Sequence, residues 1–213
     1  MVRKVSAVVL LSGGIDSAVC LSLARRRHDE VVTTAFDYGQ RNRLEVEAAR
    51  TIAAHFDVEL RIVALELPWS GSTLTGDSAA SGATSYVPGR NLVFLSLAVA
   101  QAEALGLEQV YFGAGATDRS YPDSRAEFVG SLQATVDLAL QAGLDGRPVT
   151  IRTPLMPLTK PEVIRAGVAY GTPLHLTWSC YGQGPEPCGT CGACRHRAEA
   201  FLAAGVPDPR SSP

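Results

Sequence analysis

The chain has 213 residues, of which 46% are hydrophobic and 19% are charged, and its formal net charge is −2. This composition is typical of a soluble globular protein with one sizeable core, and the near-neutral balance excludes a general attraction to nucleic acid or membranes. No apolar run reaches transmembrane length, and the short run near the N-terminus ends in glycines, unlike a signal peptide. We therefore expect a cytoplasmic protein whose thiols stay reduced.

Apolar runs, the first of them rich in valine, alternate along the chain with segments whose apolar residues recur at helical spacing. The expected strands cover residues 5–11, 31–38, 58–65, 108–115 and 149–155. The expected helices that follow them cover residues 18–27, 42–56, 90–106, 125–143 and 160–171. This alternation predicts an α/β fold with a doubly wound, mostly parallel five-stranded sheet. Such sheets bind ligands at the carboxyl ends of their strands.

Residues 68–89 interrupt the alternation with a stretch rich in Gly, Ser and Thr. A loop of this length inside a compact domain is typical of a lid, a binding loop or a disordered segment. We expect an α/β domain over residues 1–178 that contains this flexible loop, a C-terminal cysteine segment over 179–205, and a frayed tail over 206–213.

The motif Ser-Gly-Gly-Ile-Asp-Ser, residues 12–17, joins the first expected strand to the first expected helix. Two glycines permit positive φ and close backbone approach, and a helix N-terminus offers free N–H groups. Ser12 and Ser17 add hydroxyl donors, while Asp16 can hold a metal ion on a phosphate or cap the helix. The order of strand, glycines and helix favours a phosphate-binding loop over a plain glycine-rich turn. The motif is neither a Rossmann nor a Walker A loop.

Four of the five cysteines follow the pattern C-x7-C-x2-C-x2-C, namely Cys180, Cys188, Cys191 and Cys194. Short Cys-x-x-Cys loops place thiolates around one tetrahedral ion, which favours a closed, structural Zn²⁺ site. An iron–sulfur cluster, which also takes four cysteines, is the main alternative. Disulfides are disfavoured in the cytosol, and a thioredoxin-like pair would leave two cysteines unexplained. Cys20 lies among apolar residues of the first expected helix and is expected to pack in the core.

The S-G-G-x-D-S motif resembles the signature of the N-type ATP pyrophosphatases, the PP-loop superfamily, which includes GMP, NAD and asparagine synthetases and several tRNA-modifying enzymes. The resemblance implies an adenine nucleotide alpha hydrolase-like fold that binds ATP and Mg²⁺, with the ATP pyrophosphate on the loop. A substrate oxygen attacks the α-phosphorus in this superfamily, and a nitrogen or sulfur nucleophile then displaces the adenylated oxygen. The residues that the resemblance assigns to ATP are Leu11, Ser12, Gly13, Gly14, Ile15, Asp16, Ser17, Ala18, Val19, Cys20 and Leu21.

Several stretches, taken in order, resemble the 7-cyano-7-deazaguanine synthases of queuosine biosynthesis and cover nearly the whole chain. They are LLSGGIDS, FDYGQR (36–41), VPGRNLVFLSLA (87–98), TDRSYPDSRAEF (117–128), TPLMPLTKPE (153–162) and TWSCYGQGPEPCGTCGACRHRAEAF (177–201). The resemblance implies conversion of 7-carboxy-7-deazaguanine and ammonia to the 7-cyano base with ATP, through an adenylated acid and an amide. It also implies zinc on the four cysteines and a homodimer. Because the chain has no room for a fused glutaminase domain, we expect free ammonia or a partner to supply nitrogen.

Three residues are our catalytic candidates: Asp16, Lys160 and Arg90. Lys160 opens a helix after a Pro-Leu turn, where it would neutralise the ATP phosphates, although a solvated surface lysine is the alternative. Arg90 and Asn91 open the helix after the flexible loop and either contact the nucleotide or the substrate carboxylate, or cap the helix.

A deazaguanine presents ring N–H and 2-amino donors side by side, which a carboxylate accepts in bidentate fashion. Polar residues crowd the loop after the fourth expected strand, which makes that loop either a substrate site or a solvated polar loop. The substrate-binding candidates are Asn91, Asp118, Tyr121, Asp123, Arg125 and Glu127. Phe36 and Tyr38 either stack on a base or end the second strand in the core.

Two departures from the family pattern bear on the substrate. Asn42 stands where His is usual, and the loop RSYPDS is one residue shorter than in the family, with Ser124 in place of Cys. Because this loop is expected to touch the substrate, a paralogue that stops at the amide, or that couples a deazaguanine to another amine, remains an alternative.

Two further functions use parts of the same pattern. A tRNA thiolase combines this loop with a catalytic cysteine pair and a basic RNA-binding face, whereas here the metal accounts for the cysteines and the net charge is −2. A non-catalytic nucleotide-binding module would keep both the loop and the zinc, but Lys160 argues for turnover. We therefore expect small-molecule substrates and neither a nucleic-acid nor a membrane partner.

Overall fold

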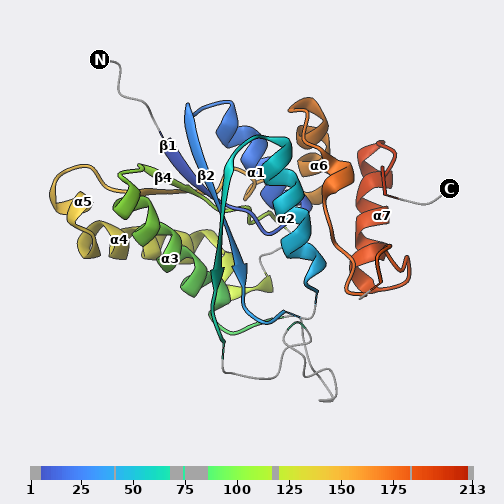
Figure 1. Cartoon of the computed structure of the whole chain (residues 1–213), viewed down its shortest axis with the longest axis horizontal. Helices are drawn as coiled ribbons and strands as arrows, with labels where there is room; N and C mark the ends of the chain where they lie inside the picture. The colour runs from blue at the N-terminus through green and yellow to red at the C-terminus, as the bar shows by residue number, and fades with distance from the viewer. Residues whose placement is uncertain are drawn as a thin grey trace.

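The computed structural model describes residues 6–40, 42–67, 74, 86–116, 120–182 and 184–210. Its centre is a parallel five-stranded sheet with the strand order β3-β2-β1-β4-β5 (Figure 1). The strands are β1 (Ser6–Leu10), β2 (Glu30–Asp37), β3 (Glu59–Ala64), β4 (Gln109–Tyr111) and β5 (Thr150–Arg152). The doubly wound α/β fold expected from the sequence is confirmed. Most of the flexible loop expected over 68–89 lies outside the described residues.

Helices cover both faces of the sheet (Figure 1). The helices on one face are α1 (Ile15–Arg25), α2 (Leu44–His55), α6 (Lys160–Ala169) and α7 (Gly192–Ala204). The other face is covered by α3 (Arg90–Leu105) and α4 (Ala126–Ala139), with the short α5 (Gln141–Leu144) after them. Among the described residues, none of the helices combines the length and the apolar character that a membrane crossing needs.

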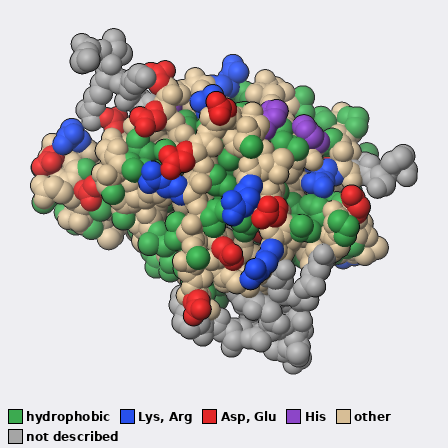
Figure 2. All heavy atoms as spheres, in the orientation of Figure 1, with side chains coloured by type: hydrophobic (Ala, Val, Ile, Leu, Met, Phe, Trp, Pro, Cys, Tyr) green, Lys and Arg blue, Asp and Glu red, His purple; other side chains and the backbone are tan. Residues whose placement is uncertain are grey.

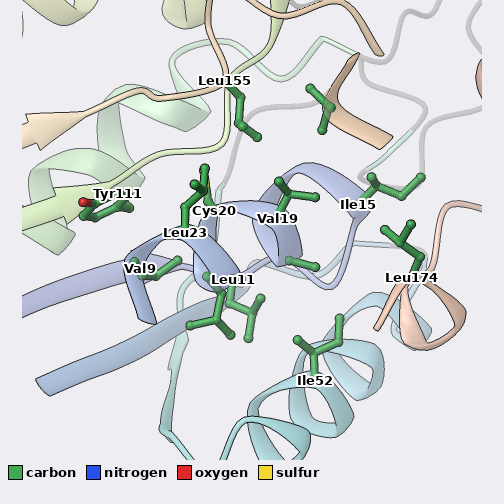
Figure 3. Packing of buried hydrophobic residues seen from close by; sticks show 14 of the residues in the cluster. Val9, Leu11, Ile15, Val19, Cys20, Leu23, Ile52, Tyr111, Leu155 and Leu174 are labelled. Carbon is green, nitrogen blue, oxygen red and sulfur yellow. The ribbon is translucent and has the colours of Figure 1, made fainter. Parts of the chain in front are cut away.

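The central strand β1 explains why the sheet is covered on both sides. All five of its residues are buried, and successive side chains point to opposite faces. Ala7 and Val9 join the core under α1, whereas Val8 and Leu10 join the core under α3. Figure 3 shows Val9 in the first of these cores with Val19 and Cys20 of α1. Cys20 is fully buried there, as expected, and burial raises the pKa of its thiol.

Several predicted boundaries were wrong. The first helix begins at Ile15 rather than at residue 18, and the fourth and fifth strands are three residues long. The helix predicted over 125–143 breaks at Leu140, whose backbone is extended, so that α5 turns back against α4. Gly143 makes this turn possible, because a Cβ there would lie 2.1 Å from the carbonyl oxygen of Asp137.

The C-terminal segment packs into the main core through α7, a helix that the sequence analysis did not predict. Phe201 is 1% exposed and lies in the same core as α1 and α6. Arg197 forms a buried ion pair with Asp208, with 2.8 Å between Nε and Oδ2, and its guanidinium also donates to Thr177. The tail from residue 206, which was expected to fray, is therefore tied to the body at least as far as Asp208.

Candidate active site and metal centre

The loop between β1 and α1 is held by its own hydroxyl groups. The Ser12 N–H donates to Ser17 Oγ at 3.1 Å, and Ser17 Oγ donates to the carbonyl oxygen of Gly14 at 2.9 Å. The Gly14 N–H donates to Ser12 Oγ at 3.4 Å. Gly14 is the N-cap of α1 and no side chain caps the helix, so the positive end of the helix dipole faces the loop. This arrangement suits an anionic phosphate.

Gly13 marks a close approach between this loop and α2. Its φ is +87°, and a Cβ there would lie 2.1 Å from the carbonyl oxygen of Glu45. The loop and the first turn of α2 therefore touch through their backbones, which brings side chains of α2 to the edge of the loop.

Replacing Gly13 with Ala is expected to lower the free energy of unfolding by about 2–4 kcal/mol, since the substitution combines positive φ with a backbone clash. Gly130→Ala is the matched control, because Gly130 lies inside α4 with nothing within 4 Å of its Cβ position. It should raise stability by about 0.5–1 kcal/mol. Urea unfolding of both variants measures the difference, and equal stabilities would contradict the close approach.

Asp16 and Lys160 meet across the loop. Lys160 Nζ lies 2.6 Å from Asp16 Oδ2, and both side chains are mostly buried. Lys160 reaches this position because it opens α6, whose start is fixed by a capping box between Thr159 and Glu162. The other oxygen of Asp16, Oδ1, is buried and has no hydrogen-bond partner among the described residues. A carboxylate oxygen left unpaired beside a phosphate loop fits a ligand of Mg²⁺.

A cavity of about 370 Å³ opens beside this loop, at the carboxyl ends of β1, β2 and β4. This volume is typical of small-molecule sites. The loop contributes a polar end, formed by Leu11, Ser12, Gly14, Asp16 and Ser17. An aromatic end is formed by Phe36, Tyr38, Phe94, Tyr121 and Tyr181. Phe36 and Phe94 stack with their ring centroids 4.0 Å apart.

The aromatic end also holds one cation and one carboxyl group. Arg90 Nη1 donates to Tyr38 Oη at 3.1 Å, and the guanidinium lies 6.0 Å from the centroid of the Phe94 ring. Glu45 lines the same cavity. Burial raises the pKa of Glu45 to about 7, and the positive charge of Arg90 opposes that rise. Burial likewise raises the pKa of Tyr38.

The structure divides the ATP-binding candidates into two groups. Five of them line the cavity, as given above, and Gly13 forms the turn of the loop. The side chains of the other five are buried in the core beneath the loop: Ile15, Ala18, Val19, Cys20 and Leu21.

The substrate-binding candidates are also divided. Asn91 and Tyr121 line the cavity together with Ser124, whose hydroxyl accepts a hydrogen bond from Asn91 Nδ2 at 2.9 Å. Asp123 instead accepts the backbone N–H of Asn91 at 2.9 Å and so fixes the start of α3. Arg125 and Glu127 line a separate pocket beside Met156. Asp118 lies outside the described residues.

The four cysteines of the C-terminal segment converge on one point. The Sγ atoms of Cys180, Cys188, Cys191 and Cys194 all lie within 4.8 Å of one another. Tetrahedral Zn–S bonds of about 2.3 Å would place sulfurs about 3.8 Å apart, so the group fits a zinc ion after a small contraction. Gly189 has a φ of +70°, a left-handed conformation that suits the turn between Cys188 and Cys191, whereas Gly192 is the first residue of α7.

Backbone N–H groups surround these sulfurs. The N–H groups of Gly182 and Cys188 donate to Cys180 Sγ at 3.1 and 3.3 Å, and the Cys194 N–H donates to Cys191 Sγ at 3.4 Å. Hydrogen bonds of this kind lower the pKa of the Cys188 thiol to about 6, and the bond from the backbone N–H of Thr190 has the largest effect. Burial raises the pKa of Cys194 to about 12. The backbone N–H groups around the cluster therefore stabilise cysteine thiolates, and a bound cation would favour the thiolate form of Cys194 as well.

The cysteine cluster is tied to the phosphate loop. The backbone N–H of Trp178 donates to the carbonyl oxygen of Gly13 at 2.9 Å, and Trp178 Nε1 donates to the carbonyl oxygen of Cys180 at 2.9 Å. Asn42, which departs from the family pattern, donates through Nδ2 to the same carbonyl oxygen. Tyr181 follows directly and lines the cavity. The cysteine cluster thus lies behind one wall of the candidate active site.

Sequence reasoning missed several residues that line the cavity, among them Glu45 and Tyr181. Glu45 belongs to the predicted second helix and Tyr181 follows the first metal ligand, so each was assigned to a different structural feature. The signal for Glu45 lay nearby in the sequence, because it stands three residues after Asn42, the position at which the family motif was compared.

The chain resembles known proteins both in sequence and in fold. Residues 6–205 match the family model described as queuosine biosynthesis protein QueC. The chain is 46% identical to the 7-cyano-7-deazaguanine synthase of Magnetococcus marinus, over 96% of this chain and 95% of that protein. It is 44% identical to the 7-cyano-7-deazaguanine synthase of Pseudomonas syringae, over 95% of this chain and 94% of that protein.

Solved structures share the fold at low sequence identity. NMN synthetase from Francisella tularensis superposes with a TM-score of 0.50 and 14% identity, covering 97% of this chain and 79% of that one. A 4-thiouridine synthetase–RNA complex with bound ATP gives a TM-score of 0.50 and 19% identity, covering 94% of this chain and 50% of that one. These likenesses concern the fold alone.

Proposed function

Because the chain belongs to the queuosine biosynthesis protein QueC family, we propose that it is an ATP-dependent carbon–nitrogen ligase. Its substrates are 7-carboxy-7-deazaguanine and ammonia, and its product is 7-cyano-7-deazaguanine. The observation that carries this proposal is the cavity that joins the phosphate loop to an aromatic pocket containing Arg90. The loop end suits the phosphates of a nucleoside triphosphate, and the aromatic end suits a planar base that bears a carboxylate.

The chemistry follows from what each group can stabilise. A carboxylate oxygen of the substrate attacks the α-phosphorus of ATP, and pyrophosphate leaves. Ammonia attacks the activated carbon, and AMP leaves with the substrate oxygen. The amide oxygen is then adenylated and expelled in the same way, which gives the nitrile. Each departing oxygen becomes part of AMP, a far better leaving group than oxide or hydroxide.

Phosphate stabilisation is assigned to the loop and to Lys160. The N-terminal N–H groups of α1 donate to phosphate oxygens, and the hydroxyl groups of Ser12 and Ser17 do so after they turn from their bonds within the loop. Lys160, held 2.6 Å from Asp16, offsets the negative charge that builds on the pyrophosphate as it leaves. Mg²⁺, when bound, would neutralise further phosphate charge, and Asp16 is the residue that would hold it.

Orientation of the base is assigned to the aromatic end. The rings of Phe36 and Tyr38 lie at the end of β2 and offer apolar surface to a planar base. Arg90 pairs with the substrate carboxylate and holds it toward the loop. Zn²⁺ on the four cysteines is structural, because four thiolates leave no open position, and it fixes the wall that carries Tyr181.

Assembly and compartment belong to the same proposal. We assign a homodimer because α3 presents Leu92, Leu97 and Leu105, each more than a third exposed, to the surface. Figure 2 shows hydrophobic side chains gathered over α3, whereas charged groups of both signs are interspersed over the rest of that face. Such interspersed charge favours neither RNA nor a membrane. Reduced zinc thiolates suit the cytoplasm, where free ammonia is the assigned nitrogen source.

The product mass tests this function. The protein is incubated with ATP, Mg²⁺, ammonia and 7-carboxy-7-deazaguanine, and the base is followed by mass spectrometry. A product lighter than the amide by one water is the expected nitrile. A reaction that halts at the amide would support the amide-forming alternative, for which Ser124 in the cavity wall is the motivating departure. No ATP consumption with any deazaguanine would rule out both.

A further inference from the structure

Carboxyl groups are scarce in the candidate active site. Among the described residues, Asp16 and Glu45 are the acidic residues that line the cavity. Asp16 is engaged by Lys160 at 2.6 Å and belongs to the phosphate loop. Glu45 belongs to the aromatic end, and its carboxyl group makes no hydrogen bond within the described part of the chain. A partly buried carboxyl group that faces a cavity without donors loses hydration, and a ligand that supplies two donors restores its hydrogen bonds.

The backbone of Glu45 is held at the edge of the cavity by the close approach of α2 to the phosphate loop. Glu45 is the second residue of α2, and its carbonyl oxygen abuts Gly13 of the phosphate loop. Tyr38 and Arg90 line the same cavity as Glu45, and the positive charge of Arg90 opposes the rise in the pKa of Glu45 that burial causes. The carboxyl group of Glu45 thus stands beside a guanidinium at the edge of an aromatic slot.

This juxtaposition matches one edge of guanine. A guanine-type base presents O6, an acceptor, next to N1–H and the 2-amino group, which are two parallel donors. A carboxylate accepts both donors, and a neighbouring guanidinium donates to O6. Adenine presents one donor and one acceptor there, so a carboxylate can satisfy only its amino group. The 7-carboxyl group of the substrate lies on the O6 side, toward Arg90.

We propose that Glu45 is the residue that reads the N1–H and 2-amino edge of the deazaguanine, with Arg90 on the O6 side. This inference rests on the proposed function and names the residue that selects its substrate. It replaces two of the carboxylates suggested by the sequence, because Asp123 is bonded to the start of α3 and Glu127 lines another pocket.

The test measures binding rather than turnover. Calorimetry gives the Kd of 7-carboxy-7-deazaguanine and of its hypoxanthine analogue, which lacks the 2-amino group. The wild-type protein should bind the guanine form about 10- to 100-fold more tightly, as expected for a bidentate pair. Glu45→Gln keeps the size of the side chain. It should raise the Kd of 7-carboxy-7-deazaguanine by a similar factor and bring the ratio of the two Kd values close to one.

Glu47→Gln is the matched control, since Glu47 lies on the same helix with its side chain 65% exposed. Glu47→Gln should leave the Kd values of both bases unchanged. Glu45→Gln should leave the Kd of ATP unchanged. Unchanged discrimination in Glu45→Gln, or a wild-type protein that binds both bases equally, would overturn the inference. A loss of ATP affinity in Glu45→Gln would assign Glu45 to the nucleotide instead. Failure of the wild-type protein to bind either base would overturn the proposed function itself.

Discussion

Lys160→Ala is expected to lower kcat/KM by about 10²- to 10³-fold, the usual effect of removing one preorganised charge from a transition state. The pyrophosphate gains negative charge as it leaves, and Lys160 is the cation held at the loop by Asp16. The main loss should appear in kcat, because the charge develops during the reaction. Steady-state kinetics with AMP as the readout measure the effect.

Arg165→Ala provides the control for this variant. Arg165 lies on the same helix as Lys160, but its guanidinium points to the C-terminal end of α7, where it donates to the carbonyl oxygen of Ala203. The substitution should leave kcat/KM unchanged. Thermal unfolding of both variants separates a kinetic loss from a folding defect. An unchanged kcat in Lys160→Ala would show that Lys160 pairs with Asp16 but does not stabilise the transition state.

Cys188→Ser is expected to lose zinc and stability together. Three thiolates and a hydroxyl bind Zn²⁺ far more weakly than four thiolates, and a structural metal contributes its binding energy to folding. Zinc content should fall from one per chain to near zero, and the unfolding midpoint should fall by about 10 °C or more. Because Tyr181 lines the cavity beside Cys180, the substrate KM should rise as well.

Cys20→Ala is the control for the metal site, since Cys20 is buried in the core under α1. It should keep one zinc per chain while losing some packing energy. The structural assignment of the cluster would be wrong if Cys188→Ser lost activity with zinc and fold intact. Iron and acid-labile sulfide in the purified protein would instead support the iron–sulfur alternative.

The strand and helix order followed from local patterns, because a buried parallel strand such as Ser6–Leu10 is apolar throughout and the helices alternate with it. The phosphate loop and the four cysteines were also predictable, since each lies within a short stretch of chain. The break at Leu140 was not, because it depends on the close approach of Gly143 to Asp137. Helix α7 was hidden because its first two turns hold Gly192, the metal-ligand candidate Cys194 and the polar residues Arg195, His196 and Arg197 in place of an apolar stripe.

The cavity was the least predictable part, because its residues come from segments that lie far apart in the sequence. Glu45 reaches the cavity only because Gly13 lets α2 touch the loop, and no spacing within the sequence reveals that contact. Asp123 matched the expected chemistry by type, but the fold uses its carboxylate to hold the Asn91 N–H. Residue type alone therefore predicted a carboxylate, but not which carboxylates line the cavity.

In the proposed reaction, a substrate oxygen attacks the α-phosphorus of ATP bound at Ser12–Ser17. Oxygen transfer from 7-carboxy-7-deazaguanine that carries ¹⁸O in both carboxylate oxygens follows this step. We expect one ¹⁸O in the phosphate group of each AMP, and two labelled AMP molecules for every nitrile formed. Label in orthophosphate together with ADP, or AMP without label, would contradict it.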